Sequence, residues 1–170
     1  MGEPPTTYGI AMGSNLGDRA ANLRSGVAQI LEAIPDARLK AEASLYETEP
    51  VDCAPGTQAF LNTVIEVESA IAPCDMREVL AGIEQAMGRP SDHGKNEPRT
   101  LDLDILYAGD WVSDDPVLIV PHPRLHERRF VLAPLAEIRG ELTLPGFSQP
   151  VAKLLAGLGD DPSSVVRVSL

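Results

Sequence analysis

The chain has 170 residues, 44% of them hydrophobic, and a net charge of −11 at neutral pH. This is typical of one globular domain with its own core, and no apolar run approaches the roughly 20 residues of a membrane-spanning helix. Such an acidic protein is a poor sequence-independent binder of nucleic acid, which needs a basic surface. Residues 1–13 lack the pattern of a signal peptide, and Cys53 and Cys74 form neither a disulfide framework nor a zinc site. We therefore expect a cytoplasmic protein with reduced thiols and with no membrane or nucleic-acid partner.

The N-terminal part predicts a strand, a tight turn and a helix. Residues 1–7 are expected to form a loose tail ahead of a short apolar strand at Tyr8–Met12. The turn Gly13–Asp18 reads GSNLGD, and its two glycines allow backbone to approach a ligand. Taken alone, it is more commonly an ordinary strand-to-helix turn. Asp18 is placed to cap a helix that Pro35 ends.

Two strands and a loop are predicted next. Arg38–Thr48 alternates between apolar and polar side chains, which is typical of a half-buried strand. Glu49–Gln58 contains prolines and a glycine and predicts a loop, and Phe60–Glu68 predicts a further strand. Phe60 and Asn62 share its face opposite the core, where a partly covered surface pair is the simplest interpretation of these two residues in isolation.

A second helix is expected after this strand, with Asp75 as its N-cap, Glu78 completing a capping box and Gly88 at its end. Glu84 lies at the border of the helix's apolar stripe, so it is either solvated or directed into a site. The polar segment Arg89–Glu97 predicts a loop.

The stretch Pro98–Leu106 reads PRTLDLDIL and has the composition of a strand apart from two aspartates. Because successive side chains of a strand point to opposite faces, Asp102 and Asp104 share one face, with Cα atoms about 7 Å apart. Burying two unpaired carboxylates is costly, so we expect a cation between them, and Mg2+ commonly binds one or two carboxylates together with substrate phosphates. Arg99 is a candidate phosphate ligand. For a lone Asp-x-Asp motif, an edge strand with a solvated acidic face is the commoner explanation.

The last third of the chain begins with Trp111–Val112, expected to be a short strand. Val120–Phe130 concentrates two of the three histidines and three arginines. In an acidic protein this suggests an anionic ligand, although a helix start with solvated basic residues explains it as readily. A buried helical turn at Phe130–Ile138, a helix at Val151–Leu158 and an apolar segment at Val165–Val168 complete the chain.

The predicted elements run in the order β-α-β-β-α-β, followed by a C-terminal extension. This order predicts an α+β, ferredoxin-like fold, an antiparallel sheet with two helices on one face. We expect one domain over residues 8–158, with a tail at 1–7 and an extension at 159–170. The other face of the sheet would be open and would carry an aromatic ring, an amide and two carboxylates, namely Phe60, Asn62, Asp102 and Asp104. The fold by itself implies no function.

Six short motifs occur in one order along the chain. They are Gly13-Ser14-Asn15-Leu16-Gly17-Asp18, Tyr46-x-Thr48, Phe60-Leu61-Asn62, Ile83-Glu84 to Gly88-Arg89, Pro98-Arg99-Thr100-Leu101-Asp102-Leu103-Asp104-Ile105-Leu106, and Pro121-His122-Pro123-Arg124 to Arg128-x-Phe130-Val131-Leu132. Together, over about residues 8–157, they resemble the 6-hydroxymethyl-7,8-dihydropterin pyrophosphokinases of folate biosynthesis. Each motif is weak alone, whereas the set with matching spacing is specific.

The resemblance implies that ATP, as co-substrate, donates its β,γ-pyrophosphoryl unit to the hydroxymethyl group of the pterin and leaves as AMP. Two Mg2+ ions would be bridged by Asp102 and Asp104, in an in-line displacement at the β-phosphorus. Catalysis would also use Arg89 and Arg99, which match phosphate-clamping arginines of the family. The implied ATP-binding residues are Glu84, Arg89, Arg99, Ile105 and His122.

The same resemblance implies a pterin site. Its residues would be Gly13, Thr48, Val51, Phe60, Asn62, Arg128 and Phe130. Phe60 and Phe130 would sandwich the ring by offset stacking, and Asn62 would offer a donor and an acceptor to the pterin edge. The loops Glu49–Ala59 and Arg89–Glu97 would close over the substrates and exclude water. We expect a monomer with these small-molecule partners.

The sequence departs from the family pattern in the second of these loops. Many relatives have Trp-Gly where this chain has Asn96-Glu97, so a bulky aromatic lid is missing. Arg89 is followed by Pro90-Ser91-Asp92, where relatives often carry basic residues, and Lys95 can compensate. We expect the reaction type to be kept while nucleotide affinity and loop closure differ.

Two other functions stay open at this point. A different magnesium-dependent nucleotide or phosphosugar transferase explains the Asp-x-Asp motif and the basic segment, but it gives Phe60, Phe130 and Asn62 no role. A ferredoxin-like binding module without catalysis predicts no metal-dependent turnover.

Overall fold

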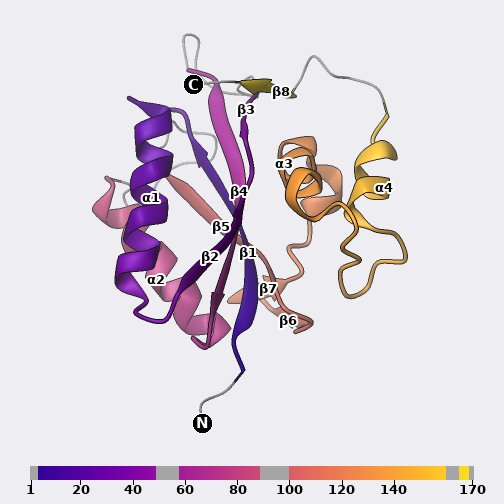
Figure 1. The fold of residues 1–170 in the computed structure, drawn as a ribbon, viewed down its shortest axis with the longest axis horizontal. Helices are drawn as coiled ribbons and strands as arrows, with labels where there is room; N and C mark the ends of the chain where they lie inside the picture. Colours follow the sequence, from indigo (N-terminus) through magenta and orange to yellow (C-terminus); the bar gives the residue numbers. More distant parts are fainter. Residues whose placement is uncertain (1–3, 49–57, 89–99, 160–164, 169–170) are drawn as a thin grey trace.

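The structure is a computed structural model and describes residues 4–48, 58–88, 100–159 and 165–168. An antiparallel sheet lies between two helical layers (Figure 1). The strands are β1 (Thr6–Ser14), β2 (Arg38–Glu42), β3 (Leu45–Thr48), β4 (Phe60–Ser69), β5 (Asp102–Ala108), β6 (Ser113–Asp115), β7 (Leu118–Val120) and β8 (Val165–Val168). The helices are α1 (Arg19–Ala33), α2 (Pro73–Ala86), α3 (Arg129–Arg139) and α4 (Val151–Ala156), with a 3-10 turn, η1, at Leu125–Glu127.

The order of strands in the main sheet is β5-β1-β4-β3-β8, and β2 also pairs with β4. All of these pairings are antiparallel, which confirms the predicted antiparallel sheet of an α+β protein. β1 lies between β4 and the edge strand β5. It begins at Thr6, which pairs with Ser69, so the last two residues of the expected tail belong to the sheet.

The predicted strand Arg38–Thr48 is two strands, β2 and β3. The break occurs at Ser44, whose backbone N–H and hydroxyl both donate to a carboxylate oxygen of Glu137 at 3.0 Å. An N–H that is bound to a side chain cannot extend the β ladder. β2 is also largely exposed, Leu39 included, so the prediction of a half-buried strand is wrong for this first half.

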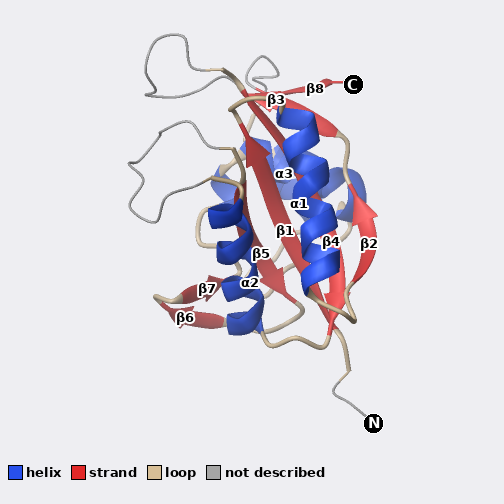
Figure 2. Ribbon diagram, turned by 90° about the vertical axis from the view of Figure 1, so that its left-hand side faces the viewer, coloured by secondary structure: helices blue, strands red, loops and turns tan. Residues whose placement is uncertain are grey.

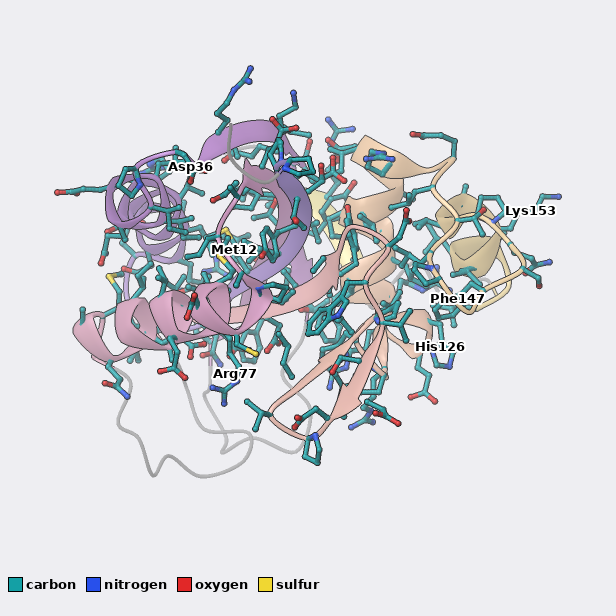
Figure 3. The ribbon with its side chains drawn as sticks, turned by 90° about the horizontal axis from the view of Figure 1, so that it is seen from below. Met12, Asp36, Arg77, His126, Phe147 and Lys153 are labelled. Carbon is teal, nitrogen blue, oxygen red and sulfur yellow. The ribbon has the colours of Figure 1, made fainter. Side chains whose placement is uncertain are left out.

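Helices α1 and α2 cover one face of the sheet (Figure 1). The helical stripes meet the apolar face of the sheet in one core, in which Met12 (labelled in Figure 3) is buried. That core includes Ile10, Met12, Leu23, Ile30, Leu61, Ile65, Leu80, Ile83, Leu101, Leu103 and Ile105. Asp18 caps α1 as predicted and accepts a hydrogen bond from the N–H of Ala21 at 3.1 Å.

Helix α2 begins earlier than predicted. Its N-cap is Ala72 and Pro73 is its first residue, whereas Asp75 lies inside the first turn. Proline suits this first position because its fixed φ is helical and its missing N–H would have no partner there. Asp75 still favours the helix, since a carboxylate near the N-terminus stabilises the helix dipole, but the predicted cap and capping box are wrong.

The opposite face of the sheet is not open along its whole length, as the sequence had led us to expect. Helices α3 and α4 pack on it (Figure 1) and form a second core. This core includes Val64, Leu106, Leu125, Leu132, Leu135 and Val151. Tyr107 joins it because β5 slips in register near Gly9, and the tyrosine ring then lies directly over that glycine.

A small hairpin, β6 with β7, projects beside α2 (Figure 2). The predicted strand at Trp111–Val112 is therefore misplaced by a few residues, and both of those side chains are exposed. In the part of the chain that the structure describes, no helix combines the length and the apolarity needed to cross a membrane.

Candidate functional site

Strand β5 carries the two aspartates at the edge of the sheet. Leu101, Leu103 and Ile105 are buried in the core under α1 and α2, so Asp102 and Asp104 project from the other face, half-buried. This is the predicted alternation. The buried leucines fix the register of β5, because a shift of one residue against β1 would turn them out of the core.

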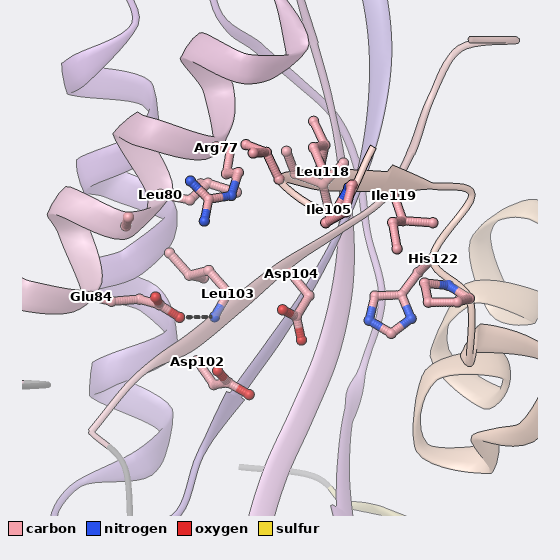
Figure 4. A pocket seen from close by; sticks show the side chains of 14 residues that line it. Arg77, Leu80, Glu84, Asp102, Leu103, Asp104, Ile105, Leu118, Ile119 and His122 are labelled. Carbon is pink, nitrogen blue, oxygen red and sulfur yellow. Dashed lines mark hydrogen bonds between the residues drawn. The ribbon is translucent and has the colours of Figure 1, made fainter. Parts of the chain in front are cut away.

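A cavity of about 380 Å³ adjoins these carboxylates (Figure 4). Its walls come from α2, β5, the β6–β7 hairpin and the segment that follows the hairpin. Five residues that the sequence assigned to metal or ATP lie in its lining: Glu84, Asp102, Asp104, Ile105 and His122. The fold thus brings together residues that are separated by 38 positions in sequence (84 to 122).

Glu84 fixes the outer edge of β5. Its Oε2 accepts a hydrogen bond from the N–H of Leu103 at 2.7 Å (Figure 4). Since alternate residues of an antiparallel strand direct their N–H and C=O groups to the same side, the backbone groups of Ile105 point outward as well. They are therefore available to the edge of a planar ring in the cavity.

His122 is held in one orientation beside β5. Its backbone N–H donates to the carbonyl of Leu106 at 2.8 Å, and its Nδ1 accepts from the N–H of Arg124 at 3.1 Å. Burial, together with Arg128 and Arg124, lowers the pKa of His122, while Asp102 acts in the opposite direction. The ring is therefore neutral at pH 7, with its proton on Nε2, because Nδ1 is an acceptor. Such a ring can donate one hydrogen bond to an anionic oxygen.

Gly13 links the acidic strand to a second group of predicted residues. It pairs with Asp102 on β5 and with Asn62 on β4. A Cβ on Gly13 would lie 3.0 Å from Oδ1 of Asn62 and 3.7 Å from the ring of Phe60. The absent side chain thus leaves a shallow space beside an amide and an aromatic ring.

Asn62 and Thr48 are joined across β3 and β4. The Nδ2 of Asn62 donates to the Thr48 hydroxyl at 2.6 Å, which assigns Nδ2 to the Thr48 side and leaves Oδ1 toward Gly13. Asn62 is 6% exposed. A buried amide held in this way presents a fixed pattern of donor and acceptor.

Phe130 and Arg128 lie at the start of α3. The guanidinium carbon of Arg128 is 5.6 Å from the centroid of the Phe130 ring, within the range of a cation–π contact. The sandwich of a ring between Phe60 and Phe130 stays a prediction, since the described contact of Phe130 is with arginine.

Three predicted site residues, Val51, Arg89 and Arg99, lie outside the described residues. The same holds for Asn96-Glu97 and for most of the two predicted closing loops. No group of three or more His, Cys, Asp or Glu side chains suited to a metal occurs within the described ranges. The aspartate pair offers two carboxylates, and Mg2+ commonly takes one or two from a protein together with substrate phosphates.

Two arginines near the site were not predicted from the sequence. Arg77 lines the cavity from α2, and its spacing of three and seven residues from Leu80 and Glu84 is the signal that could have identified it. Arg19 donates to Glu47 at 3.0 Å and to the carbonyl of Ala59 at 2.9 Å. It thereby ties α1 to both sides of the predicted loop, a contact between distant segments that no local pattern reveals.

Comparison with known proteins agrees with this arrangement. A family model described as 7,8-dihydro-6-hydroxymethylpterin-pyrophosphokinase (HPPK) matches residues 9–140. The 2-amino-4-hydroxy-6-hydroxymethyldihydropteridine pyrophosphokinase of Bacillus subtilis is 43% identical over 129 residues, which cover 76% of this chain and 75% of that protein. The protein of the same name from Methylorubrum extorquens is 39% identical over 160 residues, covering 94% and 96% of the two chains.

Longer proteins contain the same unit. The folate synthesis bifunctional protein of Arabidopsis thaliana is 39% identical over 133 residues, but the match covers only 26% of it. A crystal structure of a Plasmodium falciparum HPPK-DHPS triple mutant with pteroate shares the fold, with a TM-score of 0.76 at 13% identity, over 98% of this chain and 47% of that one. This chain therefore spans less than half of that protein. From the family match and the two bacterial relatives, we conclude that the chain belongs to the 7,8-dihydro-6-hydroxymethylpterin-pyrophosphokinase family.

Proposed function

We propose that this protein transfers pyrophosphate from ATP to the hydroxymethyl group of 6-hydroxymethyl-7,8-dihydropterin, giving AMP and the pterin diphosphate for folate biosynthesis. The observation that carries the proposal is the row Asp102–Gly13–Asn62 across three neighbouring strands. It joins a carboxylate edge, suited to metal-bound phosphates, to an amide and an aromatic ring, suited to a flat heterocycle.

At the phosphate end, Asp102 and Asp104 would hold Mg2+, for which the resemblance implies two ions. Their fit is supported by chemistry, because both are hard oxygen donors on one face of an edge strand. When bound, Mg2+ neutralises phosphate charge and makes the attacking hydroxyl easier to deprotonate. Neutral His122 would donate a hydrogen bond from its Nε2–H to a phosphate oxygen, and Arg89 and Arg99 would clamp the phosphates.

At the pterin end, Asn62 would hydrogen-bond the edge of the ring, with Thr48 holding the amide in place. Phe60 and Phe130 would stack on the ring, and Arg128 would lie near the transferred group. The backbone of Gly13 would form the floor, since a side chain there would contact Asn62. Val51 and the two loops would complete the pterin site and exclude water, so that transfer is faster than ATP hydrolysis.

The finer structural and cellular expectations belong to the same proposal. Two features support a ferredoxin-like arrangement. The strands β5, β1 and β4 lie side by side in that order, with β2 and β3 paired to β4, and the helices α1 and α2 cover one face of the sheet. We also propose a monomeric, cytoplasmic protein without nucleic-acid partners, and the acidic composition supports the last of these three expectations.

The test is AMP formation from ATP and Mg2+, with and without the pterin, in wild type and Asp104→Asn. Asp114→Asn, which alters an exposed aspartate on β6, is the matched control. We expect pterin-dependent AMP release, a loss of at least about a hundredfold in kcat for Asp104→Asn, and no change for the control. ADP or free phosphate as product would favour another phosphotransferase, and a folded protein without turnover would favour a binding module.

A further inference from the structure

Arg77 supplies the one guanidinium among the described residues that line the cavity. It lies on α2 on the same helical face as Leu80 and Glu84, and its head group points from the helix toward the cavity (Figure 4). The other ionisable groups of the lining are three carboxylates and His122. Among the described residues of the lining, Arg77 is therefore the one permanent positive charge.

The ion pair of Arg77 with Glu78 leaves its guanidinium available to a ligand. Its Nη1 lies 3.2 Å from Glu78, the next residue, and the two side chains are 44% and 74% exposed. An exposed ion pair of this kind contributes little, because water and salt screen it. A ligand that buries the guanidinium can displace Glu78 at small cost.

The position of Arg77 indicates which part of a nucleotide it meets. The Glu84 carboxylate accepts a hydrogen bond from the N–H of Leu103, which lies between the two aspartates in sequence. Arg77 precedes Glu84 by seven residues, which is about 10.5 Å along a helix. Its end of the cavity is walled by Leu80 and Leu118 (Figure 4). When the phosphates lie at the carboxylates, the base reaches this apolar end.

We propose that Arg77 is a specificity-determining residue that binds the nucleobase of ATP. The inference rests on the proposed function, in that ATP is taken to occupy this cavity. A guanidinium is planar and has only donors, so it can stack on the base or donate to a ring nitrogen, while the outward backbone groups of Ile105 meet the base edge. Lysine offers the charge without the plane.

Binding measurements on the full chain test this, with Mg2+ present throughout. The probes are α,β-methylene ATP, in which a methylene group replaces the bridging oxygen between the α- and β-phosphorus atoms so that this link is not cleaved, and inorganic tripolyphosphate, which has no base. The variants are Arg77→Ala and Arg77→Lys. Arg38→Ala is the control, because Arg38 is an arginine on β2, paired with Glu68 and outside the cavity.

We expect Arg77→Ala to weaken binding of the ATP analogue by about three- to thirtyfold, with tripolyphosphate unchanged. Arg77→Lys should recover less than half of the loss, and Arg38→Ala should match wild type. Equal loss for both probes, or full recovery by lysine, would overturn the base contact in favour of charge alone, and no loss for either probe would remove Arg77 from the site. If wild type made no AMP while Arg77→Ala lost only the ATP analogue, the proposed reaction would be wrong and the base contact right.

Discussion

Gly13 lies opposite Asn62 in the sheet, so close that a Cβ on the glycine would be 3.0 Å from the Oδ1 of the asparagine. Gly13 does not need glycine for its backbone angles, because it is an ordinary strand residue outside the positive-φ region. The absence of a side chain matters for the space that it leaves. That space adjoins both the amide of Asn62 and the ring of Phe60.

We predict that Gly13→Ala raises the KM for the pterin by about tenfold and leaves the affinity for ATP unchanged. The added methyl group would occupy the floor of the pterin site and press on Asn62. Steady-state kinetics with each substrate varied in turn measures the effect.

The control for this prediction is Gly82→Ala. A Cβ on Gly82, in the middle of α2, meets nothing within 4 Å, and alanine is the better helix former. This variant should keep both KM values and be slightly more stable. An unchanged pterin KM in Gly13→Ala, with the protein folded, would remove Gly13 from the pterin site.

His122 provides a prediction about pH. Burial is the largest cause that lowers its pKa in the folded protein, so between the folded pKa and the unfolded value of about 6.5 the unfolded chain binds more protons. Stability therefore rises with pH in this window. As the pH falls below about 6.5, the folded state loses stability until His122 itself is protonated.

Replacing His122 by glutamine, which keeps a donor near the position of Nε2, should remove this part of the pH dependence. Urea unfolding at pH 7.5 and at pH 5 would show a smaller loss of free energy in His122→Gln than in wild type. His126→Gln is the control, since His126 is exposed in the turn η1, where its ring lies beside that of Phe147. An identical loss in wild type and His122→Gln would contradict the assignment of a neutral, half-buried imidazole.

The alternation in β5 illustrates what the sequence predicts well. Leu103 and Ile105 are apolar and the aspartates between them are charged, so local periodicity is enough to assign both faces, and the structure agrees. The end of α1 and the cap by Asp18 were predicted for the same reason, because the interactions involved span only a few residues.

Features that depend on distant contacts were not predictable. The strand break at Ser44 requires Glu137, which lies 93 residues later. Tyr107 changes face because β5 slips against β1, and the coverage of the second face requires α3 and α4. Arg77 enters the cavity only because the β6–β7 hairpin forms the opposite wall. The periodicity of the sequence contains no information on such contacts between distant segments.

The buried carboxylate of Glu66 forms an ion pair on which the stability of the fold is expected to depend. It is 4% exposed, accepts a hydrogen bond from the Tyr107 hydroxyl, and pairs with Arg139 of α3 at 2.9 Å. Burial and the hydrogen bond to Glu66 raise the pKa of Tyr107, so its hydroxyl stays a donor.

Arg139→Met would leave the buried charge of Glu66 without its cation, and we expect a loss of about 3 kcal/mol in the free energy of unfolding. Glu66→Gln added to Arg139→Met should restore much of this loss, because the remaining amide is neutral. Urea unfolding of wild type, Arg139→Met, Glu66→Gln and the double variant measures the coupling. Because α3 packs on a part of the sheet that is far from Asp104, we expect the folded Arg139→Met protein to keep its KM values. A selective loss of pterin affinity would instead show that the pair of Glu66 and Arg139 also positions Arg128 and Phe130 at the start of α3.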